Sequence, residues 1–217
     1  MIITEKKPFA EVIDSLVGVE KIFLVGCGEC ATTCKTGDSE EIAAVKAALE
    51  KHGKVVAGSC IPNAPCVAAQ VKAALAKNMA VLRQADAILV LACGLGVQSV
   101  RENNRLGQAV VPALDSVCAA VVDAHGVFQE KCSLCGACVL GVTAGICPIT
   151  LCPKGLLNGP CGGVSNGTCE VSPELECAWV LIYNELKKRG KTGMFQEIRA
   201  PRDYSKSYKP HTSMMEK

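Results

Sequence analysis

Short apolar runs recur through the first half of the chain. The runs at residues 21–26, 54–58 and 87–92 are each typical of a buried strand. A fourth run at 109–112 is a weaker strand candidate because it contains a proline, which cannot donate to a sheet ladder. These runs predict the strands of one sheet.

Amphipathic stretches fill the intervals between these runs. Residues 8–16 present one apolar helical face, and a helix is predicted to begin at Asp38, with Glu41 completing a reciprocal cap. Helical periodicity also covers residues 65–85, with a break expected near Asn78. Strands alternating with helices about every 30 residues indicate βαβ units. We therefore expect an α/β fold with an open parallel sheet whose strand carboxyl ends share one edge.

The pattern changes near Lys131. Residues 132–177 contain eight cysteines and four prolines with little periodicity, which is typical of a module organised by metal rather than by an apolar core. A helix is predicted over 173–189, and basic residues dominate from there to the end of the chain. We expect an α/β domain with an amino-terminal cluster site (1–126), a small cysteine-rich iron–sulfur module with a C-terminal helix (127–190) and a basic extended tail (191–217).

Composition excludes several classes of protein. Apolar residues make up 49% of the 217 residues and the formal net charge is only +2, which excludes extensive disorder. Fifteen cysteines, an odd number, follow a charged first segment that lacks the pattern of an export signal. The longest uncharged apolar run, residues 87–97, is about half of a bilayer span. We expect a cytoplasmic protein, without membrane contact, whose thiols are reduced or hold metal.

Several cysteines follow the predicted strands. Cys27, Cys30 and Cys34 come directly after the first strand, Cys60 ends the second, and Cys93 follows the third. Because parallel strands end at the same edge, three loop thiols and one thiol from a neighbouring strand would complete the four-thiolate site of a [4Fe–4S] cluster. The fourth ligand stays open between Cys60 and Cys93, with Cys93 favoured because glycines flank it.

The remaining thiols divide into a dense set and scattered ones. The carboxyl-terminal set contains eight metal-ligand candidates, enough for two four-thiolate sites: Cys132, Cys135, Cys138, Cys147, Cys152, Cys161, Cys169 and Cys177. C-x2-C-x2-C spacing followed by Cys-Pro is typical of bacterial ferredoxin clusters. Zinc, which also takes four thiolates, is an alternative at one site. Spacing alone does not pair these eight. Cys60, Cys66 and Cys118 are expected to be small buried hydrophobes.

One stretch of the chain resembles a known family. It is the motif Leu-Leu-Asn-Gly-Pro-Cys-Gly-Gly at residues 156–163, with Cys147-Pro148 before it and Cys177-Ala178-Trp179 after it. This region is similar to the cysteine-rich domain associated with bacterial and archaeal methylenetetrahydrofolate reductases. With the segments around Cys27 and Cys93, the chain to about Gly190 resembles the small iron–sulfur subunit of the acetogen-type enzyme. Thr143-Ala144-Gly145 departs from the Thr-Gly-Gly usual in that family.

The resemblance implies a function. In that family a separate barrel subunit holds FMN and reduces methylenetetrahydrofolate to methyltetrahydrofolate in one-carbon metabolism, within the Wood–Ljungdahl pathway. The small subunit carries two or three [4Fe–4S] clusters that pass electrons to that flavin, with a further electron-donor complex as a possible partner. Family resemblance also favours Cys27, Cys30, Cys34 and Cys93 as the amino-terminal ligands. This chain would then be a non-catalytic subunit without a complete active site.

Three alternatives remain open at this stage. The chain could be a zinc or iron–sulfur adaptor that holds the reductase complex together without relaying electrons. It could be an enzyme with an open iron held by Cys27, Cys30 and Cys34 alone. A zinc-built nucleic-acid module is disfavoured by the near-neutral charge and scarce aromatics. A dinucleotide site is not expected, because the G-x-G-x-x-G spacing is missing.

Overall fold

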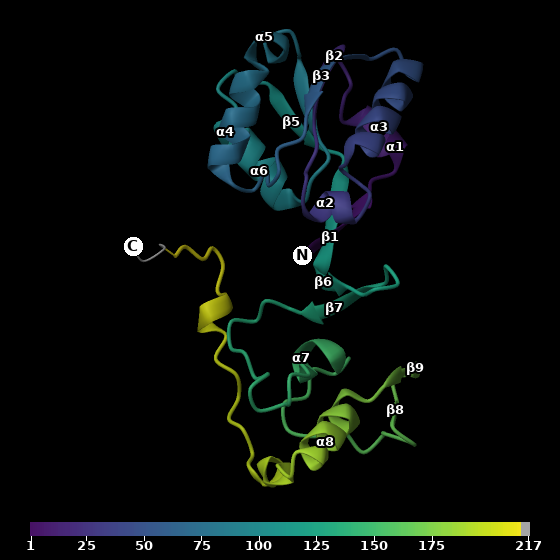
Figure 1. The fold of residues 1–217 in the computed structure, drawn as a ribbon, viewed down its shortest axis with the longest axis vertical. Helices are drawn as coiled ribbons and strands as arrows, with labels where there is room; N and C mark the ends of the chain where they lie inside the picture. Colours follow the sequence, from purple (N-terminus) through teal and green to yellow (C-terminus); the bar gives the residue numbers. More distant parts are fainter. Residues whose placement is uncertain (214–217) are drawn as a thin grey trace. The chain divides into compact units, whose positions relative to one another are not determined.

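A computed structural model describes residues 1–213 (Figure 1). The chain divides into two compact units between Cys118 and Ala119. The predicted class is confirmed, since the first unit is α/β and its main sheet is parallel. Within residues 1–213, no helix combines the length and the apolar character that crossing a membrane requires.

The main sheet of the first unit has four parallel strands in the order β3-β2-β4-β5. Its strands are β2 (Lys21–Val25), β3 (Val55–Cys60), β4 (Ala87–Val90) and β5 (Ala109–Pro112). Each matches an apolar run of the sequence. The proline-containing run forms the edge strand β5, where a missing backbone donor is tolerated. At one register position Val25 lies between Cys60 of β3 and Val90 of β4.

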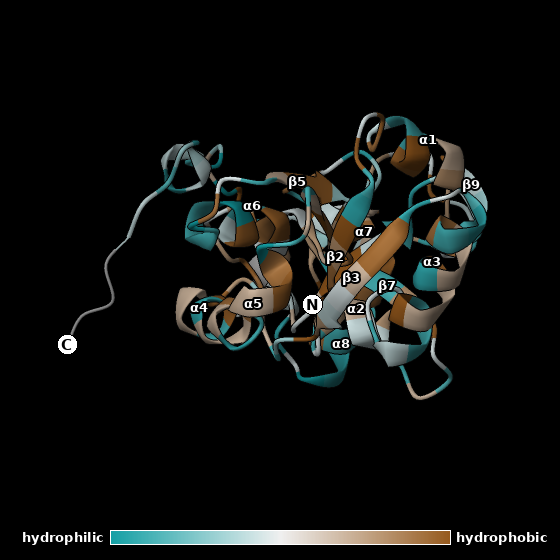
Figure 2. Cartoon of the chain, turned by 90° about the horizontal axis from the view of Figure 1, so that it is seen from above, coloured by the Kyte–Doolittle hydropathy of each residue, from teal (hydrophilic) through white to brown (hydrophobic). Residues whose placement is uncertain are grey.

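Helices cover both faces of this sheet (Figures 1 and 2). The helices are α1 (Phe9–Asp14), α2 (Cys30–Thr33), α3 (Ser39–Lys51), α4 (Ala68–Lys77), α5 (Met79–Leu82) and α6 (Gly94–Asn103). In the figures α1 and α3 lie on one face and α4, α5 and α6 on the other. The strands between them are aliphatic, and Leu24, Leu89 and Leu91 have no exposed surface. Burial on both faces explains why these strands read as continuous apolar runs.

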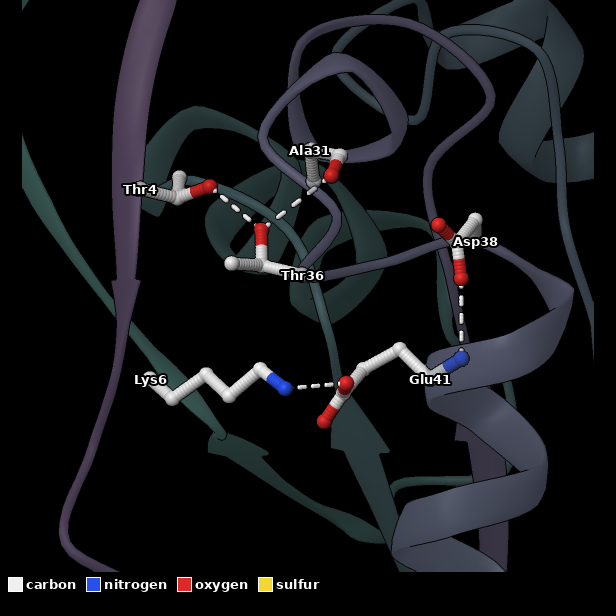
Figure 3. A network of polar contacts seen from close by, with 6 residues as sticks. All are labelled: Thr4, Lys6, Ala31, Thr36, Asp38 and Glu41. Atoms are coloured by element: carbon white, nitrogen blue, oxygen red, sulfur yellow. Dashed lines mark hydrogen bonds and ion pairs between the residues drawn. The ribbon is translucent and has the colours of Figure 1, made fainter.

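The start of α3 differs in one detail from the predicted cap. The Asp38 carboxylate accepts a hydrogen bond from the Glu41 N–H at 2.8 Å, as predicted (Figure 3). The Glu41 carboxylate does not return to the Asp38 backbone. It contacts the Lys6 ammonium instead, so the capping box is only half formed. The predicted helix break is confirmed at Asn78, which lies between α4 and α5. Its side-chain amide donates a hydrogen bond to the Ala74 carbonyl of α4.

Four elements of the structure were not predicted. They are β1 (Ile2–Lys6), α6, β6 (Leu114–Val122) and β7 (Phe128–Cys132), of which the strands form a second sheet in the order β1-β6-β7. β1 carries little apolar sequence, and it is anchored by the Thr4 hydroxyl, which lies 2.7 Å from the buried hydroxyl of Thr36 (Figure 3). All five residues of β7 are exposed, so no hydropathy signal marks it.

The second unit has a small core and much irregular chain. Its regular elements are α7 (Pro148–Leu151), β8 (Thr168–Cys169), β9 (Ser172–Glu176), α8 (Ala178–Lys188) and 3-10 turns at Thr192–Gln196 and Ser205–Ser207. The helix predicted over 173–189 begins at Ala178, because the preceding residues pair with β8 as β9. Its buried face carries Trp179, Ile182 and Leu186.

The predicted tail, 191–217, is described as far as residue 213, and residues 214–217 lie outside the described part. The described portion contains the two 3-10 turns instead of one continuous extended arm. Asn158 holds it near one end, accepting from the Arg199 N–H at 2.8 Å and donating to the Arg199 carbonyl at 3.0 Å. Side-chain hydrogen bonds therefore tie this segment to the cysteine-rich unit.

Loss of the α3 cap should weaken the first unit measurably. Asp38→Ala leaves the Glu41 N–H without its side-chain acceptor, and we expect a loss of about 1 kcal/mol of unfolding free energy. Asp38→Ser, which restores a capping oxygen, should recover most of it. Chemical denaturation monitored by circular dichroism measures both variants. Equal stabilities for Asp38→Ala and Asp38→Ser would contradict this role of the side chain.

Candidate iron–sulfur sites

The amino-terminal cysteines gather where the strand order of the main sheet reverses. The chain passes from β2 to β3 on one side and then returns to β4 on the other side of β2. The carboxyl ends of β2 and β4 therefore flank the switch point, which is where open α/β sheets bind ligands. Cys27 follows β2, and Cys93 follows β4 as the N-cap of α6. Cys60 instead ends β3, on the outer side of β2.

Backbone amides surround the Cys27 thiol. Cys27 is 5% exposed, and burial raises the pKa of its thiol. The N–H groups of Ala31 and Glu29 act in the opposite direction by donating toward the sulfur, whereas the nearby thiols of Cys30 and Cys93 raise the pKa further. Cys27, Cys30 and Cys93 therefore lie close enough for their charges to interact. Donor amides beside several thiols suit a cluster, whose sulfur atoms accept such hydrogen bonds.

The loop around Cys27 needs glycine for close backbone packing. A Cβ on Gly26 would lie 2.5 Å from the Gly37 carbonyl oxygen, and one on Gly37 would collide with the Leu91 carbonyl oxygen. The Cys27 N–H donates to the Gly37 carbonyl at 3.0 Å, which closes this loop. Side chains are thus excluded where the loop passes over the ends of β2 and β4.

Cys34 and Cys60 lie in different surroundings. Cys34 is half-buried just after α2, with its sulfur 4.0 Å from the Ile2 carbonyl oxygen of β1. Burial alone raises the pKa of Cys60 to about 11. A thiol that resists deprotonation is a poor metal ligand, because metals bind the thiolate. The raised pKa does not decide the matter alone, because burial raises the pKa of Cys27 as well. Cys93 is favoured as the fourth ligand by its position beside Cys27 at the switch point of the sheet.

The three cysteines predicted to be small buried hydrophobes differ in their exposure to solvent. Cys66 is exposed, so the prediction of a buried residue is wrong for it. It lies in the turn before α4. Cys60 and Cys118 are half-buried.

The first carboxyl-terminal set, Cys132, Cys135, Cys138 and Cys147, extends from the end of β7 to the N-cap of α7. Cys132 and Cys138 are exposed, and the other two are half-buried. Burial opposes ionisation of Cys135, but the Ala137 N–H, the Ser133 hydroxyl and the Arg202 guanidinium together lower the pKa of its thiol. These donors favour the thiolate, the form that binds metal.

The second set, Cys152, Cys161, Cys169 and Cys177, lines one narrow cavity of about 10 Å³. These thiols come from the end of α7, the loop after Pro160, β8 and the N-cap of α8. The Gly163 N–H and the Lys154 ammonium lower the pKa of Cys161 despite an opposing effect of burial, and Lys154 also pairs with Glu170. The structure thus places four cysteines that sequence spacing left unassigned around one cavity.

Across residues 1–213, no three His, Cys, Asp or Glu side chains have converged to metal-binding distance. The thiols do nevertheless fit metal groups by their chemistry, with donors that lower the pKa of Cys135 and Cys161 and amides that donate toward Cys27. The sequence analysis did not identify the two cationic side chains that lie beside these thiols, Lys154 near Cys161 and Arg202 near Cys135. Lys154 follows Cys152-Pro153 directly and could have been noticed, whereas Arg202 lies 67 residues from Cys135 and has no local signal.

The environment of Cys60 predicts low reactivity. At pH 8 a thiol with a pKa of about 11 is almost entirely protonated, and only the thiolate attacks an alkylating reagent. We expect iodoacetamide to modify Cys60 at least about tenfold more slowly than exposed Cys66, with the difference shrinking as the pH approaches that pKa. Timed alkylation followed by peptide mass spectrometry measures both rates in one sample. Equal rates at pH 8 would contradict the burial of Cys60.

Comparison with known proteins bears on the carboxyl-terminal part of the chain. A search of the curated proteins and of the solved structures found no match. Residues 111–205 match the family model described as methylene-tetrahydrofolate reductase C terminal. That span contains the eight cysteines from Cys132 to Cys177 and also Arg202. The carboxyl-terminal part of this chain is therefore similar to the C-terminal domain of methylenetetrahydrofolate reductases.

Proposed function

We propose that this chain is the iron–sulfur electron-transfer subunit of a methylenetetrahydrofolate reductase complex. It would relay single electrons to the FMN of a separate barrel subunit, which reduces methylenetetrahydrofolate to methyltetrahydrofolate. The observation that carries the proposal is the match of residues 111–205 to the reductase C-terminal family, because this span includes all eight carboxyl-terminal cysteines. The cytoplasm is the expected compartment, since it keeps thiols available for metal.

Cys27, Cys30, Cys34 and Cys93 are the proposed ligands of the amino-terminal [4Fe–4S] cluster. The position of Cys27 and Cys93 beside the switch point supports this assignment, as do the amides that donate toward Cys27. A bound cluster supplies one-electron chemistry, with a potential tuned by charge and by hydrogen bonds to sulfur. The chain's own contribution is to hold the thiolates at the edge of a rigid sheet.

Cys132, Cys135, Cys138 and Cys147 are proposed to hold a second [4Fe–4S] cluster. Their C-x2-C-x2-C spacing is the ferredoxin pattern, and the next cysteine is followed by proline as in ferredoxins. Donors from Ala137, Ser133 and Arg202 that lower the pKa of Cys135 support a thiolate site here.

A single zinc ion is the proposed occupant of the remaining site, Cys152, Cys161, Cys169 and Cys177. The cavity that these thiols help to line, about 10 Å³, has room for roughly one water-sized sphere. Four thiolates are a typical structural zinc set. This feature also favours a structural role for part of the module, so a zinc-dependent adaptor is the second candidate function.

Metal analysis tests these assignments together. We expect about eight irons with matching acid-labile sulfide, and about one zinc, per chain purified without oxygen from cells with intact cluster assembly. About twelve irons and no zinc would contradict the zinc assignment alone. Zinc without sulfide would overturn the relay and leave the adaptor.

The relay itself predicts electron transfer to a flavoprotein. The chemically reduced, metal-loaded chain should reduce the FMN of a flavoprotein that co-purifies with it, observed as bleaching of the flavin absorbance under anaerobic conditions. The control is the same flavoprotein mixed with chain from which the metals were removed. A co-purifying flavoprotein that the reduced chain leaves oxidised would contradict electron relay.

Alanine variants identify the fourth amino-terminal ligand. Cys93→Ala should lose about four irons, because one missing thiolate destabilises the cubane. Cys60→Ala removes a thiol of similar size from the same sheet edge and should keep the full iron content. Iron and sulfide assays with electron paramagnetic resonance spectra measure both. Loss of iron in Cys60→Ala with retention in Cys93→Ala would reverse the assignment, and retention in both would favour an open-iron site held by Cys27, Cys30 and Cys34.

A further inference from the structure

Residues 202–206, near the end of the described chain, pack against the loop that carries Cys135 and Cys138. The Arg202 Nη2 atom donates to the Ala137 carbonyl at 2.8 Å and to the Cys135 carbonyl at 3.4 Å. Gly136, between those two residues, has a φ of +78°, and a Cβ there would lie 2.8 Å from the Cβ atom of Lys206. The cysteine loop and the 202–206 segment are therefore packed backbone to backbone.

The Arg202 guanidinium also lies close enough to the Cys135 thiol to lower its pKa. The Arg202 Nε and Nη1 atoms are buried without a hydrogen-bond acceptor. No carboxylate among residues 1–213 forms an ion pair with Arg202; neighbouring Asp203 accepts instead from the Ser205 N–H and hydroxyl, both at 2.8 Å. The Tyr204 ring centroid lies 5.6 Å from the Arg202 Cζ atom and restrains the guanidinium.

Buried, unpaired donors on a charged group are unfavourable and require an explanation. The acceptors missing here would be sulfur atoms, because the guanidinium already contacts the backbone of Cys135 and Ala137. Thiolates and sulfides of a cluster at this loop would carry the negative charge that the unpaired N–H groups lack. The guanidinium is thus placed for a cofactor that these cysteines would hold.

We propose that Arg202 is a positioning residue of the cluster site formed by Cys132, Cys135, Cys138 and Cys147. Through the carbonyls of residues 135 and 137 it holds the loop in shape, and through its unpaired N–H groups it donates toward the cluster sulfurs. Its positive charge favours the reduced cluster, which carries one more negative charge, and so raises the reduction potential. This inference rests on the proposed function, because it requires a cluster at these cysteines.

Substitutions of Arg202 in the full chain, with a control at a second arginine, test the role of Arg202. Arg202→Gln removes the positive charge and most of the guanidinium N–H donors. Arg202→Lys keeps the charge but lacks the planar guanidinium group. Arg199→Gln is the control, because it also removes one positive charge, three residues earlier in the chain. The hydrogen bonds of Arg199 to Asn158 come from its backbone, so the substitution leaves them in place. Redox titration followed by electron paramagnetic resonance, with iron and sulfide assays, is carried out on all three and on the unmodified chain.

We expect Arg202→Gln to lower the potential of one cluster only, Arg202→Lys to lower it less, and Arg199→Gln to leave it unchanged. An unchanged potential in Arg202→Gln at full iron content would overturn the proposal and leave Arg202 with a purely structural role. If Arg202→Gln loses iron, Arg202→Lys decides: an unshifted potential there overturns the proposal. An unmodified chain without iron and sulfide would instead overturn the proposed function, which distinguishes the two failures.

Discussion

The parallel pairing of β2 with both β3 and β4 is the constraint on which the amino-terminal site depends. β2 is buried on both faces, and its neighbours lie in register so that Val25 is aligned with Cys60 on one side and Val90 on the other. This order makes the carboxyl ends of β2 and β4 the switch point of the sheet. The apolar core therefore decides which cysteines lie beside the switch point, since it fixes the strands that precede them.

The second unit is organised differently. Its apolar core is built around one face of α8, with Trp179, Ile182 and Leu186 buried among partly buried neighbours. Side-chain hydrogen bonds supply much of the remaining order, including the Trp179 Nε1 donor to the Leu156 carbonyl at 3.0 Å and the Asn158 contacts with Arg199. A unit with so small a core has most to gain from bound metal, because the free energy of metal binding is also free energy of folding.

Hydrogen-bond donors lie beside a thiol in each of the three cysteine groups. Cys93, Cys147 and Cys177 occupy the N-cap positions of α6, α7 and α8. Two cationic side chains, Lys154 and Arg202, lie near Cys161 and Cys135 and lower the pKa of those thiols.

The sequence by itself determined the α/β class, the four parallel strands, the Asp38 cap and the break at Asn78, because each depends on local apolar periodicity or on one capping side chain. It did not reveal β1, α6, β6 or β7; the three strands pair with one another across distant parts of the chain, and the fully exposed β7 carries no hydropathy signal. Only the tertiary structure brought Cys152, Cys161, Cys169 and Cys177 to one cavity and Arg202 to the loop at Cys135. Irregular loops have no period that relates one cysteine to another, so their pairing is decided by how the chain folds back on itself.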